Sequence, residues 1–524
     1  MPTTTRTTRP WLVLAILCLS LLLAVVDNTI VNVALPTLST ELSASTTQLQ
    51  WIVDAYTLVF AALLLPMGHF GDRFGRKKAL LIGLGAFAAT SALAAASTTA
   101  PQLIGSRALM GVGAALLFPA TLAILVNVFT DPKQRAAAIG IWTACTGLAV
   151  AIGPITGGFL LEHFSWGSIF IVNIPVCALA ILLGLIFVPD SMDAAVGRMD
   201  FPGLVLSIAG VGLLIWSIIE APSWGWTSPA ILAAMLTAIA LLVVFVIMES
   251  RTAHPLLDIT LFANMRFSAA AISVMAAFFA LFGFIFLITQ FFQLIQGYSP
   301  LEAGLRTLPF ALATGIMSPV AIVLMHRFGS KLVVATGLFV MAIGFVMAAT
   351  VKADSPYFGV VVLSMITMAV GLALTTSPAT ESIMGALPAE RAGVGSAVND
   401  TTREFGGTLG VAIIGSVFAS IYSAQVADAL STLRIDPAAS AAIESSVGAG
   451  ASIASQLPAP IGVQVQTAID DAFISGMSRG SIVAALVALI GSLIVLRYLP
   501  ARSREMRSSG QEPSGTLTVS AVEA

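Results

Sequence analysis

Charged residues are scarce in this chain, where Asp, Glu, Lys and Arg together make up 10% of 524 residues. A soluble domain carries about 25% charged residues. Because 57% of the residues are hydrophobic and the mean hydropathy is +0.97, the chain cannot cover its own surface with polar groups in water. This excludes an ordinary water-soluble protein, and we expect lipid to surround much of it. The sequence also lacks a large basic block of the kind that binds nucleic acid.

Cysteine and histidine are also rare. The three cysteines, Cys18, Cys145 and Cys177, lie in apolar runs, and the four histidines are scattered along the chain. The sequence therefore predicts no disulfide framework, no metal site and no cofactor. It lacks the glycine-rich Gly-x-x-x-x-Gly-Lys-Ser/Thr loop that holds nucleotide phosphates. We accordingly expect a protein that is not an enzyme, although an integral-membrane enzyme stays the alternative of a different class.

Hydrophobic runs long enough to form transmembrane helices of about 20 residues recur along the whole chain. The first begins at Trp11, after Arg6 and Arg9, and reaches Pro36. It is too long for the core of a signal peptide, and we expect it to be retained as the first helix. Fourteen such runs are bounded by charges, Pro or Gly, at residues 11–36, 47–68, 78–97, 101–128, 135–161, 166–188, 201–219, 228–249, 267–295, 302–325, 331–350, 356–378, 393–422 and 479–499.

The distribution of basic residues predicts the orientation of these helices. Loops on the cytoplasmic side of membrane proteins are enriched in Lys and Arg. With the N-terminus in the cytoplasm, the cytoplasmic segments hold 18 of the 24 basic residues, whereas the outer segments hold only Lys352, Arg434 and Arg479. An even number of spans also returns the C-terminus to the cytoplasm. We therefore predict a multi-pass protein of the cell membrane with both termini inside.

A short internal repeat predicts how the helices are grouped. Residues 72–77 read Asp-Arg-Phe-Gly-Arg-Lys and residues 326–331 read His-Arg-Phe-Gly-Ser-Lys, each between two apolar runs. Transporters are often built from such repeats, with the binding site between them. We expect an all-α integral membrane fold with two six-helix bundles and two extra central helices. The predicted parts are a cytoplasmic N-terminus (1–10), an N-terminal bundle (11–190), a two-helix insert (191–265), a C-terminal bundle (266–500) with an extracytoplasmic segment at 423–478, and a cytoplasmic tail (501–524).

The loop after the second run carries the strongest local motif. Its glycines permit a tight turn between two helices, and Asp72 is placed to cap the incoming helix. Arg73, Arg76 and Lys77 are long enough to reach carboxylates or helix C-termini of the neighbouring half and so to latch one conformation. The alternative is that these cations only set the topology. The predicted cytoplasmic gating loop comprises Gly68, Asp72, Arg73, Gly75, Arg76 and Lys77.

The fifth run combines small residues with a proline. Small residues let another helix approach closely, and a proline within a helix removes a backbone hydrogen bond and bends it. Ordinary packing of small residues is the alternative interpretation. The residues concerned are Gly147, Gly153, Pro154, Gly157 and Gly158.

Together these motifs resemble those of the major facilitator superfamily, in its drug:proton antiporter branch with fourteen helices. The resemblance includes the Gly-x-x-x-Asp-Arg-x-Gly-Arg-Lys form of the loop, the string at 27–36 that begins with Asp27, and the string at 107–113 that begins with Arg107. It implies proton-coupled export of small amphiphilic molecules, with the motif of the fifth helix as a mark of exporters. One departure is the string from Trp166 to Pro175, which lacks the Arg and second Trp usual in this branch.

Ionisable residues inside the predicted spans are candidates for proton coupling. Such residues are costly in lipid, at about 2.5–3.5 kcal/mol each on insertion scales, so we expect them to face the interior. Arg107 needs a counter-charge, and Asp27 and Asp54 are the acids available in the same half. A carboxyl group holds its proton more tightly when dehydrated and less tightly beside an arginine, so relative motion can load and release a proton. The alternatives are a static ion pair at Arg107, backbone contacts at Asp27 and a solvated position for Asp54.

Two further acids predict a site for cationic substrates. Asp400 and Glu404 lie four residues apart and hence on one helix face, with Arg403 beside them. In the antiporter branch, acidic residues at matching positions are linked to the transport of cationic drugs. A solvated place for Asp400 at the cytoplasmic mouth is the alternative. Aromatic rings can add cation–π contacts, and the candidates are Trp51, Tyr56, Trp142, Phe278, Phe279 and Phe282.

The sequence thus favours a secondary exporter that exchanges protons for amphiphilic, cationic drugs or toxic compounds by alternating access. Export of a native metabolite, such as a lipid, siderophore or antibiotic, would use the same motifs. The expected partners are the small-molecule substrate, protons and the bilayer, with no nucleic acid, and the expected state is a monomer.

Overall fold

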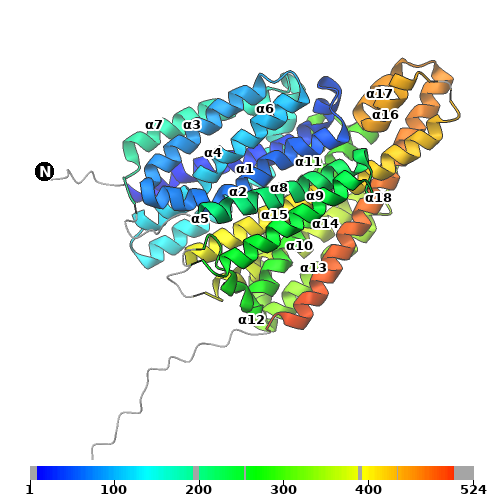
Figure 1. The fold of residues 1–524 in the computed structure, drawn as a ribbon. Helices are drawn as coiled ribbons and strands as arrows, with labels where there is room; N and C mark the ends of the chain where they lie inside the picture. Colours follow the sequence, from blue (N-terminus) through cyan, green and yellow to red (C-terminus); the bar gives the residue numbers. More distant parts are fainter. Residues whose placement is uncertain (1–8, 193–199, 253–254, 388–391, 434, 501–524) are drawn as a thin grey trace, which may run out of the picture.

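The computed structural model describes residues 9–192, 200–252, 255–387, 392–433 and 435–500 (Figure 1). It is a bundle of long helices. Fourteen helical segments within the described residues are long and apolar enough to cross a membrane, as the sequence predicts. The predicted tail at 501–524, and residues 1–8 of the predicted N-terminus, lie outside the described residues.

The helices follow one another along the chain with short connections. The N half is the group α1 (Pro10–Glu41), α2 (Thr46–Phe74), α3 (Arg76–Ala95), α4 (Ala100–Val128), α5 (Pro132–His163), α6 (Ser168–Ile171) and α7 (Asn173–Phe187). The insert is α8 (Phe201–Trp224) and α9 (Pro229–Glu249). The C half is η1 (Ile259–Ala263), α10 (Met265–Gln290), η2 (Phe291–Ile295), α11 (Pro300–Arg306), α12 (Leu308–Phe328), α13 (Ser330–Ala348), η3 (Tyr357–Val361), α14 (Val362–Met384), α15 (Ala392–Leu430), α16 (Pro437–Ser445), α17 (Val447–Gln456) and α18 (Ala459–Tyr498).

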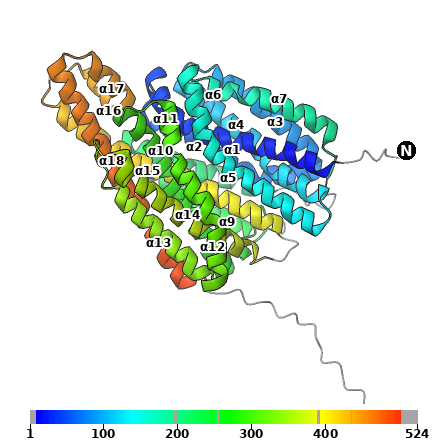
Figure 2. The ribbon, with the colours of Figure 1, turned by 180° about the vertical axis from the view of Figure 1, so that it is seen from behind.

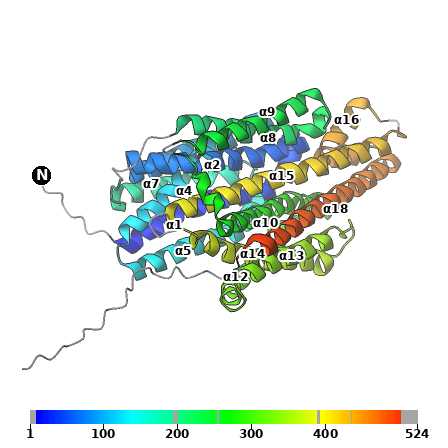
Figure 3. The ribbon, with the colours of Figure 1, turned by 60° about the horizontal axis from the view of Figure 1, so that its bottom comes forward.

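Because successive long helices alternate in direction, each connection falls at one of two ends of the bundle. The end where α1 begins, here called the basic end, collects the loops with Arg73, Arg76, Lys133, Arg327 and Arg497. The opposite end carries α16 and α17, far from the start of α1 in both Figure 1 and Figure 2. The insert lies along one side of the bundle beside α2 and α15, as Figure 3 shows. The uneven distribution of basic residues along the sequence therefore corresponds to their gathering at one end of the bundle.

The two copies of the internal repeat form matching turns. Gly75 joins α2 to α3 with φ +113°, and Gly329 joins α12 to α13 with φ +87°. Both turns lie at the basic end, and side chains with a Cβ rarely adopt this backbone region. The matching glycines give the two halves the same tight reversal between helices.

Close helix crossings depend on glycine at the contact points. Between α13 and α14, a Cβ placed on Gly371 would lie 2.5 Å from the backbone nitrogen of Met341. Gly337 meets the same crossing from the other helix, where a Cβ would lie 2.8 Å from the carbonyl oxygen of Gly371. In lipid, helix association depends on such close packing rather than on the hydrophobic effect. These two glycines therefore set the spacing of the α13–α14 pair.

Several boundaries differ from those expected. The run predicted at 201–219 continues as α8 to Trp224, because the carboxylate of Glu220 accepts a hydrogen bond from Trp51 and does not end the helix. The run predicted at 302–325 begins earlier, at Pro300, and is broken at Thr307 between α11 and α12. A charged residue is thus a poor predictor of a helix end when another side chain can form a hydrogen bond with it.

The predicted outer segment at 423–478 is mostly a continuation of neighbouring helices. Helix α15 extends to Leu430 and α18 begins at Ala459, so Arg479, expected in a loop, lies within α18. Among the described residues between them, only the short helices α16 and α17 are formed. Tyr422 donates a hydrogen bond to the carbonyl of Ile443 at 3.0 Å and joins this pair to α15.

Helices α16 and α17 also contact the N half. The hydroxyl of Ser446 donates to the carbonyl oxygen of Ala44 at 3.0 Å, and that of Thr46 donates to the carbonyl oxygen of Ser445 at 3.3 Å. Both contacts lie at the connection between α1 and α2. The pair therefore joins the two halves at the opposite end.

We expect Gly371→Leu to destabilise the protein, because its side chain has to displace the backbone of α13. Overpacking of a core typically costs about 1–3 kcal/mol, so in a chain of this length the apparent melting temperature in detergent should fall by about 1–3 °C. The matched control is Gly85→Leu in α3, where a Cβ meets no atom within 4 Å. Differential scanning fluorimetry compares the two, and equal melting temperatures would contradict the packing described here.

Candidate functional site

A buried ion pair lies inside the N half. Asp27 of α1 and Arg107 of α4 are fully buried, and one guanidinium nitrogen of Arg107 donates to the Oδ2 atom of Asp27. The amide of Asn173, the first residue of α7, donates to Oδ1 of Asp27 at 2.8 Å. The same amide donates to Ser91 of α3 at 3.3 Å. Three helices thus meet at one carboxylate, which has partners on both oxygens, and α3 is joined to them through Asn173.

Arg107 is held by α2 as well as by Asp27. Its Nε donates to the carbonyl oxygen of Ile52 at 3.1 Å, and its guanidinium carbon lies 4.3 Å from the centre of the Tyr56 ring. A cation over an aromatic face is stabilised by the ring quadrupole. The remaining nitrogen, Nη2, is buried and has no hydrogen-bond partner within the described residues. A movement of α2 would therefore change the surroundings of Arg107 directly.

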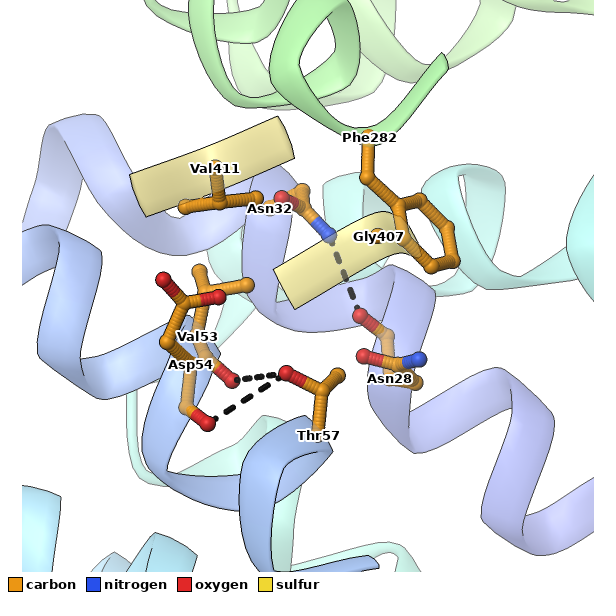
Figure 4. Close-up of a pocket in the computed structure, with 8 residues that line it drawn as sticks. All are labelled: Asn28, Asn32, Val53, Asp54, Thr57, Phe282, Gly407 and Val411. Atoms are coloured by element: carbon orange, nitrogen blue, oxygen red, sulfur yellow. Dashed lines mark hydrogen bonds between the residues drawn. The ribbon is translucent and has the colours of Figure 1, made fainter. Parts of the chain in front are cut away.

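Asp54 is separate from this pair, although the sequence grouped the three together. It is fully buried, and neither of its carboxylate oxygens has a hydrogen-bond partner among the residues described. It lines a small, water-sized cavity between the halves. Figure 4 shows the lining side chains, which come from α1, α2, α10 and α15: Asn28, Asn32, Val53, Asp54, Thr57, Phe282, Gly407 and Val411.

Polar contacts between α2 and α15 flank this cavity. On one side the amide of Gln50 donates to the carbonyl oxygens of Val411 and Ala412, at 3.2 and 3.1 Å. On the other side the hydroxyl of Thr408 donates to that of Thr57 at 3.0 Å. Residues 50, 54 and 57 share one face of α2, following the helical repeat. The cavity thus lies within the seam where the two halves touch.

The acids of α15 lie near the same seam. Asp400 lies 3.7 Å from Arg403, and the guanidinium carbon of Arg403 lies 4.5 Å from the centre of the Phe278 ring. The Asp400 side chain is 16% exposed, which is much less than a solvated mouth residue would be. Glu404 has a buried oxygen, Oε2, with no partner in the part of the chain that the structure describes. The segment therefore carries one paired and one unpaired acid.

The three aromatic residues predicted to bind a cation have other partners here. The ring of Tyr56 lies under Arg107, and its hydroxyl donates to the carbonyl oxygen of Ala24 at 3.2 Å. The indole of Trp142 is buried and donates to Thr121 at 3.2 Å, and that of Trp51 donates to Glu220 of the insert at 3.0 Å. Among the predicted aromatics, Phe282 lines the cavity.

The predicted gating loop makes its contacts within the N half. Asp72 pairs with Nε of Arg76 at 2.7 Å and does not cap α3 by a side-chain hydrogen bond. Lys77 donates to the carbonyl oxygen of Leu185 near the end of α7 at 3.0 Å. Arg76 thus reaches a carboxylate and Lys77 a helix C-terminus of their own half, whereas we expected such partners in the neighbouring half. Arg73 lies over the ring of Phe74, and Gly68 faces Pro119 of α4.

The motif of α5 faces two different helices. Gly153 and Gly157 lie against Thr29 and Ile30 of α1. Gly158 lies against α11, where a Cβ would be 2.6 Å from the Cα atom of Leu301, and the backbone of Pro154 lies against Gly304 of α11. Gly147, nearer the basic end, has open space beside its Cα atom. The close contact between α5 and the C half is therefore confined to the opposite end.

The described residues contain no group of three or more His, Cys, Asp or Glu side chains placed to hold a metal ion. Residues 476–480 have the letters Gly-Met-Ser-Arg-Gly, the spacing of a hydrolase nucleophile motif. That motif needs a turn from a strand into a helix, whereas Ser478 lies inside α18 and donates to the carbonyl oxygen of Ala349 at 2.8 Å. The pattern is therefore part of helix packing.

Several residues that build these sites were not predicted as site residues. Asn173 lies within the string from Trp166 to Pro175, which the sequence analysis treats only as a departure from the family, and Gln50 and Thr57 lie on either side of Asp54 at helical spacing. That spacing was a usable signal for a polar face of α2. Ser91 and Thr408 carried no comparable signal, because single hydroxyl residues are common in membrane helices.

Comparison of the sequence with protein families gives a match to the Major Facilitator Superfamily over residues 17–411. The chain is 38% identical to the multidrug efflux pump LfrA of Mycolicibacterium smegmatis, over 94% of this chain and 97% of that protein. It is 33% identical to the tetracenomycin C resistance and export protein of Streptomyces glaucescens, over 93% of this chain and 91% of that protein. It is 35% identical to the methyl viologen resistance protein SmvA of Salmonella typhimurium, over 89% of this chain and 93% of that protein.

Solved structures with a similar fold are transporters. A bacterial homolog of the human lysosomal transporter Spinster, in an inward-facing and occupied conformation, matches with a TM-score of 0.66 and 16% identity, over 94% of this chain and 98% of that chain. A D-xylose–proton symporter matches with a TM-score of 0.59 and 15% identity, over 94% of this chain and 98% of that chain. At these identities the likeness concerns the fold alone.

We expect Arg107→Met to destabilise the protein, because it leaves the buried carboxylate of Asp27 without its cation. Removing one partner of a buried pair costs about 3–5 kcal/mol. Adding Asp27→Asn to this variant removes the uncompensated charge and should restore much of the lost stability. Asp27→Asn alone should be milder, since its amide oxygen still accepts from Arg107. Apparent melting temperatures of the four proteins measure the coupling, and strictly additive losses would contradict a direct pair.

Proposed function

Because the chain belongs to the major facilitator superfamily, we propose that it is a proton-coupled exporter of small amphiphilic, cationic molecules that works by alternating access. Its family match, its relatives and the similar solved structures are those of membrane transporters, which confirms the expectation that it is not an enzyme. Its efflux and resistance relatives support a multi-pass drug exporter. Our proposal further includes protons as the driving ion, the cell membrane as the location and a cytoplasmic position for both termini.

The observation that carries proton coupling is the buried pair of Asp27 and Arg107. Both are fully buried, so a change in their separation alters the charge balance of a site without bulk water. Arg107 is also held by α2 through Ile52 and Tyr56, and α2 forms one wall of the seam with α15. A rocking motion that shifts α2 would move Arg107 relative to Asp27. The carboxylate would then take up a proton when Arg107 moves away and release it when Arg107 returns.

Alternating access is supported by where the halves touch. The hydrogen bonds that join the N half to the C half extend from Thr57 and Thr408 to the opposite end, where Ser299 of the C half donates to Glu162 at 3.3 Å. With the basic end in the cytoplasm, hydrogen bonds placed in this way correspond to a state closed to the outside.

Cationic substrates are supported by the acids along α15. Asp400, Arg403 and Glu404 lie on the C half, and Phe278 adds an aromatic face beside them. An amphiphilic cation needs both apolar surface and negative charge, and this segment offers the two together. The paired state of Asp400 keeps it neutralised until a substrate cation competes with Arg403.

Export of a native product is the second candidate. One relative is named as a resistance and export protein for tetracenomycin C, an antibiotic. The same helices and the same coupling pair would serve this role. A substrate panel that includes neutral antibiotics as well as lipophilic cations separates the two possibilities.

We expect Asp27→Asn to abolish proton-driven export, because an amide cannot take up and release a proton. Full-length protein in liposomes, with an imposed pH gradient and a fluorescent cationic dye, measures the rate of export. The wild-type rate should fall to that of empty liposomes when the gradient is collapsed with an ionophore. The variant should show the collapsed rate under either condition.

Size-exclusion chromatography provides the control that Asp27→Asn still yields folded protein in the membrane. Export by the folded variant at the wild-type rate would overturn the role of Asp27. A wild-type rate that ignores the pH gradient would instead overturn proton coupling as a whole.

We expect Asp400→Asn to reduce export of cationic substrates more than that of neutral ones, because only the former gain from its charge. Loss of one charge-assisted contact is worth about 1.5–3 kcal/mol, so the apparent affinity for a cation should fall about tenfold or more. Concentration dependence of export for one cationic and one neutral drug checks this. Equal losses for both would point to a structural role at Arg403.

A further inference from the structure

The carboxylate of Asp27 has two partners, and only one of them is an ion. Arg107 pairs with Oδ2, whereas Oδ1 accepts from the side-chain amide of Asn173 at 2.8 Å. The same amide nitrogen donates to the hydroxyl of Ser91 at 3.3 Å. Asp27 and Ser91 are fully buried and Asn173 is 2% exposed, so bulk water does not reach these contacts. Any change of protonation at Asp27 must therefore be accommodated by this cluster itself.

The local sequence explains why Asn173 lies at this point. Pro175 has no backbone N–H to donate to the carbonyl oxygen of Ile171, four residues earlier, so the helix is interrupted there. Helix α6 accordingly ends at Ile171 and α7 begins at Asn173. Because α7 packs against both α1 and α3, the amide at its start can contact Asp27 of one helix and Ser91 of the other.

Proton uptake would reverse what this cluster needs. An ionised carboxylate only accepts hydrogen bonds, whereas a protonated carboxyl group also has an O–H to donate. With Arg107 withdrawn and a proton on Oδ1 of Asp27, that O–H would face the N–H of Asn173, so two donors would meet in a buried place. An unmet buried donor is costly. The protonated state therefore needs an acceptor where the structure now has a donor.

The amide of Asn173 can supply that acceptor by turning over. A side-chain amide has a carbonyl oxygen on one side and an NH₂ group on the other, and a half-turn exchanges them. Among the described residues the amide oxygen takes part in no hydrogen bond, so the half-turn loses no contact on that side. The hydroxyl of Ser91 both donates and accepts, and can rotate to donate to the amide oxygen. The three side chains are thus hydrogen-bonded in either protonation state of Asp27.

The other groups around Asp27 do not offer this exchange. The titratable groups that face it from neighbouring helices are Arg107 of α4, Tyr56 of α2 and Cys177 of α7. Arg107 can only donate, and the hydroxyl of Tyr56 donates to a backbone carbonyl. Within the described residues no hydrogen bond joins Cys177 to Asp27. Of the hydrogen-bonding partners of Asp27 in that part of the chain, Asn173 is the one that can both donate and accept.

We propose that Asn173 is a positioning residue for the proton on Asp27, and that its amide, held by Ser91, turns over when Asp27 is protonated. This rests on the proposed function and extends it from the ion pair to α3 and α7. As Arg107 moves away, the amide oxygen accepts the new O–H of Asp27. As Arg107 returns, the proton leaves and the amide N–H donates again to the ionised carboxylate. Asn173 therefore adds to Arg107 in setting how tightly the proton is held.

Infrared difference spectroscopy tests the contact between Asn173 and Asp27. Full-length protein in lipid is titrated from acidic to alkaline buffer, and the carboxyl C=O band of Asp27 is assigned by its absence from Asp27→Asn. Asn173→Leu removes the amide. Because a hydrogen bond to the ionised form is stronger than one to the neutral form, the band should titrate about one pH unit higher in this variant. Its frequency should also shift, since the carboxyl group loses a partner.

Two serine variants test the part of Ser91. Ser91→Ala keeps the amide but removes its second partner, so the midpoint should shift in the same direction by less. Ser20→Ala is the matched control, because Ser20 is a fully buried serine of α1 that donates to the carbonyl oxygen of Ile16 in its own helix at 2.9 Å. It should leave the midpoint of Asp27 unchanged. An unchanged midpoint in Asn173→Leu would overturn the proposal.

The turn of the amide has a readout of its own. In protein isotopically labelled at the side-chain amides of asparagine, the NMR signals of the Asn173 NH₂ group are identified by their absence from Asn173→Leu. They should move at the pH at which the Asp27 band titrates, and they should stay in place in Asp27→Asn. Signals that do not respond to the titration of Asp27 would contradict the turn of the amide and overturn the proposal.

Transport assays separate this proposal from a structural role and from the proposed function. In liposomes under a fixed pH gradient, Asn173→Leu should export a cationic dye several-fold more slowly than the wild type. Exchange of labelled for unlabelled dye at equal pH on both sides needs the moving halves but no proton turnover, so this variant should lose much less of it. Equal loss of both would make Asn173 a structural residue and overturn the assignment. A wild type whose Asp27 band titrates as expected, but whose export ignores the gradient, would contradict the proposed function alone.

Discussion

A guanidinium group enclosed in a bundle of apolar helices constrains everything around it. Lipid offers Arg107 neither water nor counter-ions, so its charge and its donors must be met from within the protein. Asp27, Ile52 and Tyr56 meet the charge and two of the three nitrogens from two other helices. Because Asn173 donates a hydrogen bond to the second carboxylate oxygen of Asp27, the N half is organised around one buried charge pair. The relative positions of α1, α2, α4 and α7 follow from this requirement.

The helices could be predicted from the sequence because the bilayer imposes a simple rule. A span needs about 20 apolar residues, and basic loops stay on one side. The boundaries failed where a charged residue had an unforeseen partner, as Glu220 has in Trp51. They also failed at 423–478, where α15 and α18 continue through residues of mixed polarity. Helix ends depend on tertiary contacts that a single sequence does not display.

The site could be predicted in part. The acids and Arg107 were recognisable because ionisable residues are rare in spans, and Asp27 was named as one possible counter-charge. Sequence alone could not separate Asp54 from that pair, because the separation depends on how α1 and α2 are rotated about their axes. The same holds for Tyr56, whose ring faces the protein's own cation. Residue type identified the candidate site residues, and the rotation of each helix about its axis determined which of them are in contact.

The insert adds a mechanical consequence to the two-half design. Helix α8 is fastened to α2 where Glu220 accepts from Trp51, and to α15 where the carbonyl oxygen of Ile218 accepts from Ser416 at 2.8 Å. A rigid helix that is hydrogen-bonded to both α2 and α15 cannot keep both contacts when those two helices separate. Any separation of α2 from α15 must stretch or release one of these ties, so one flank of the protein resists opening more than the other.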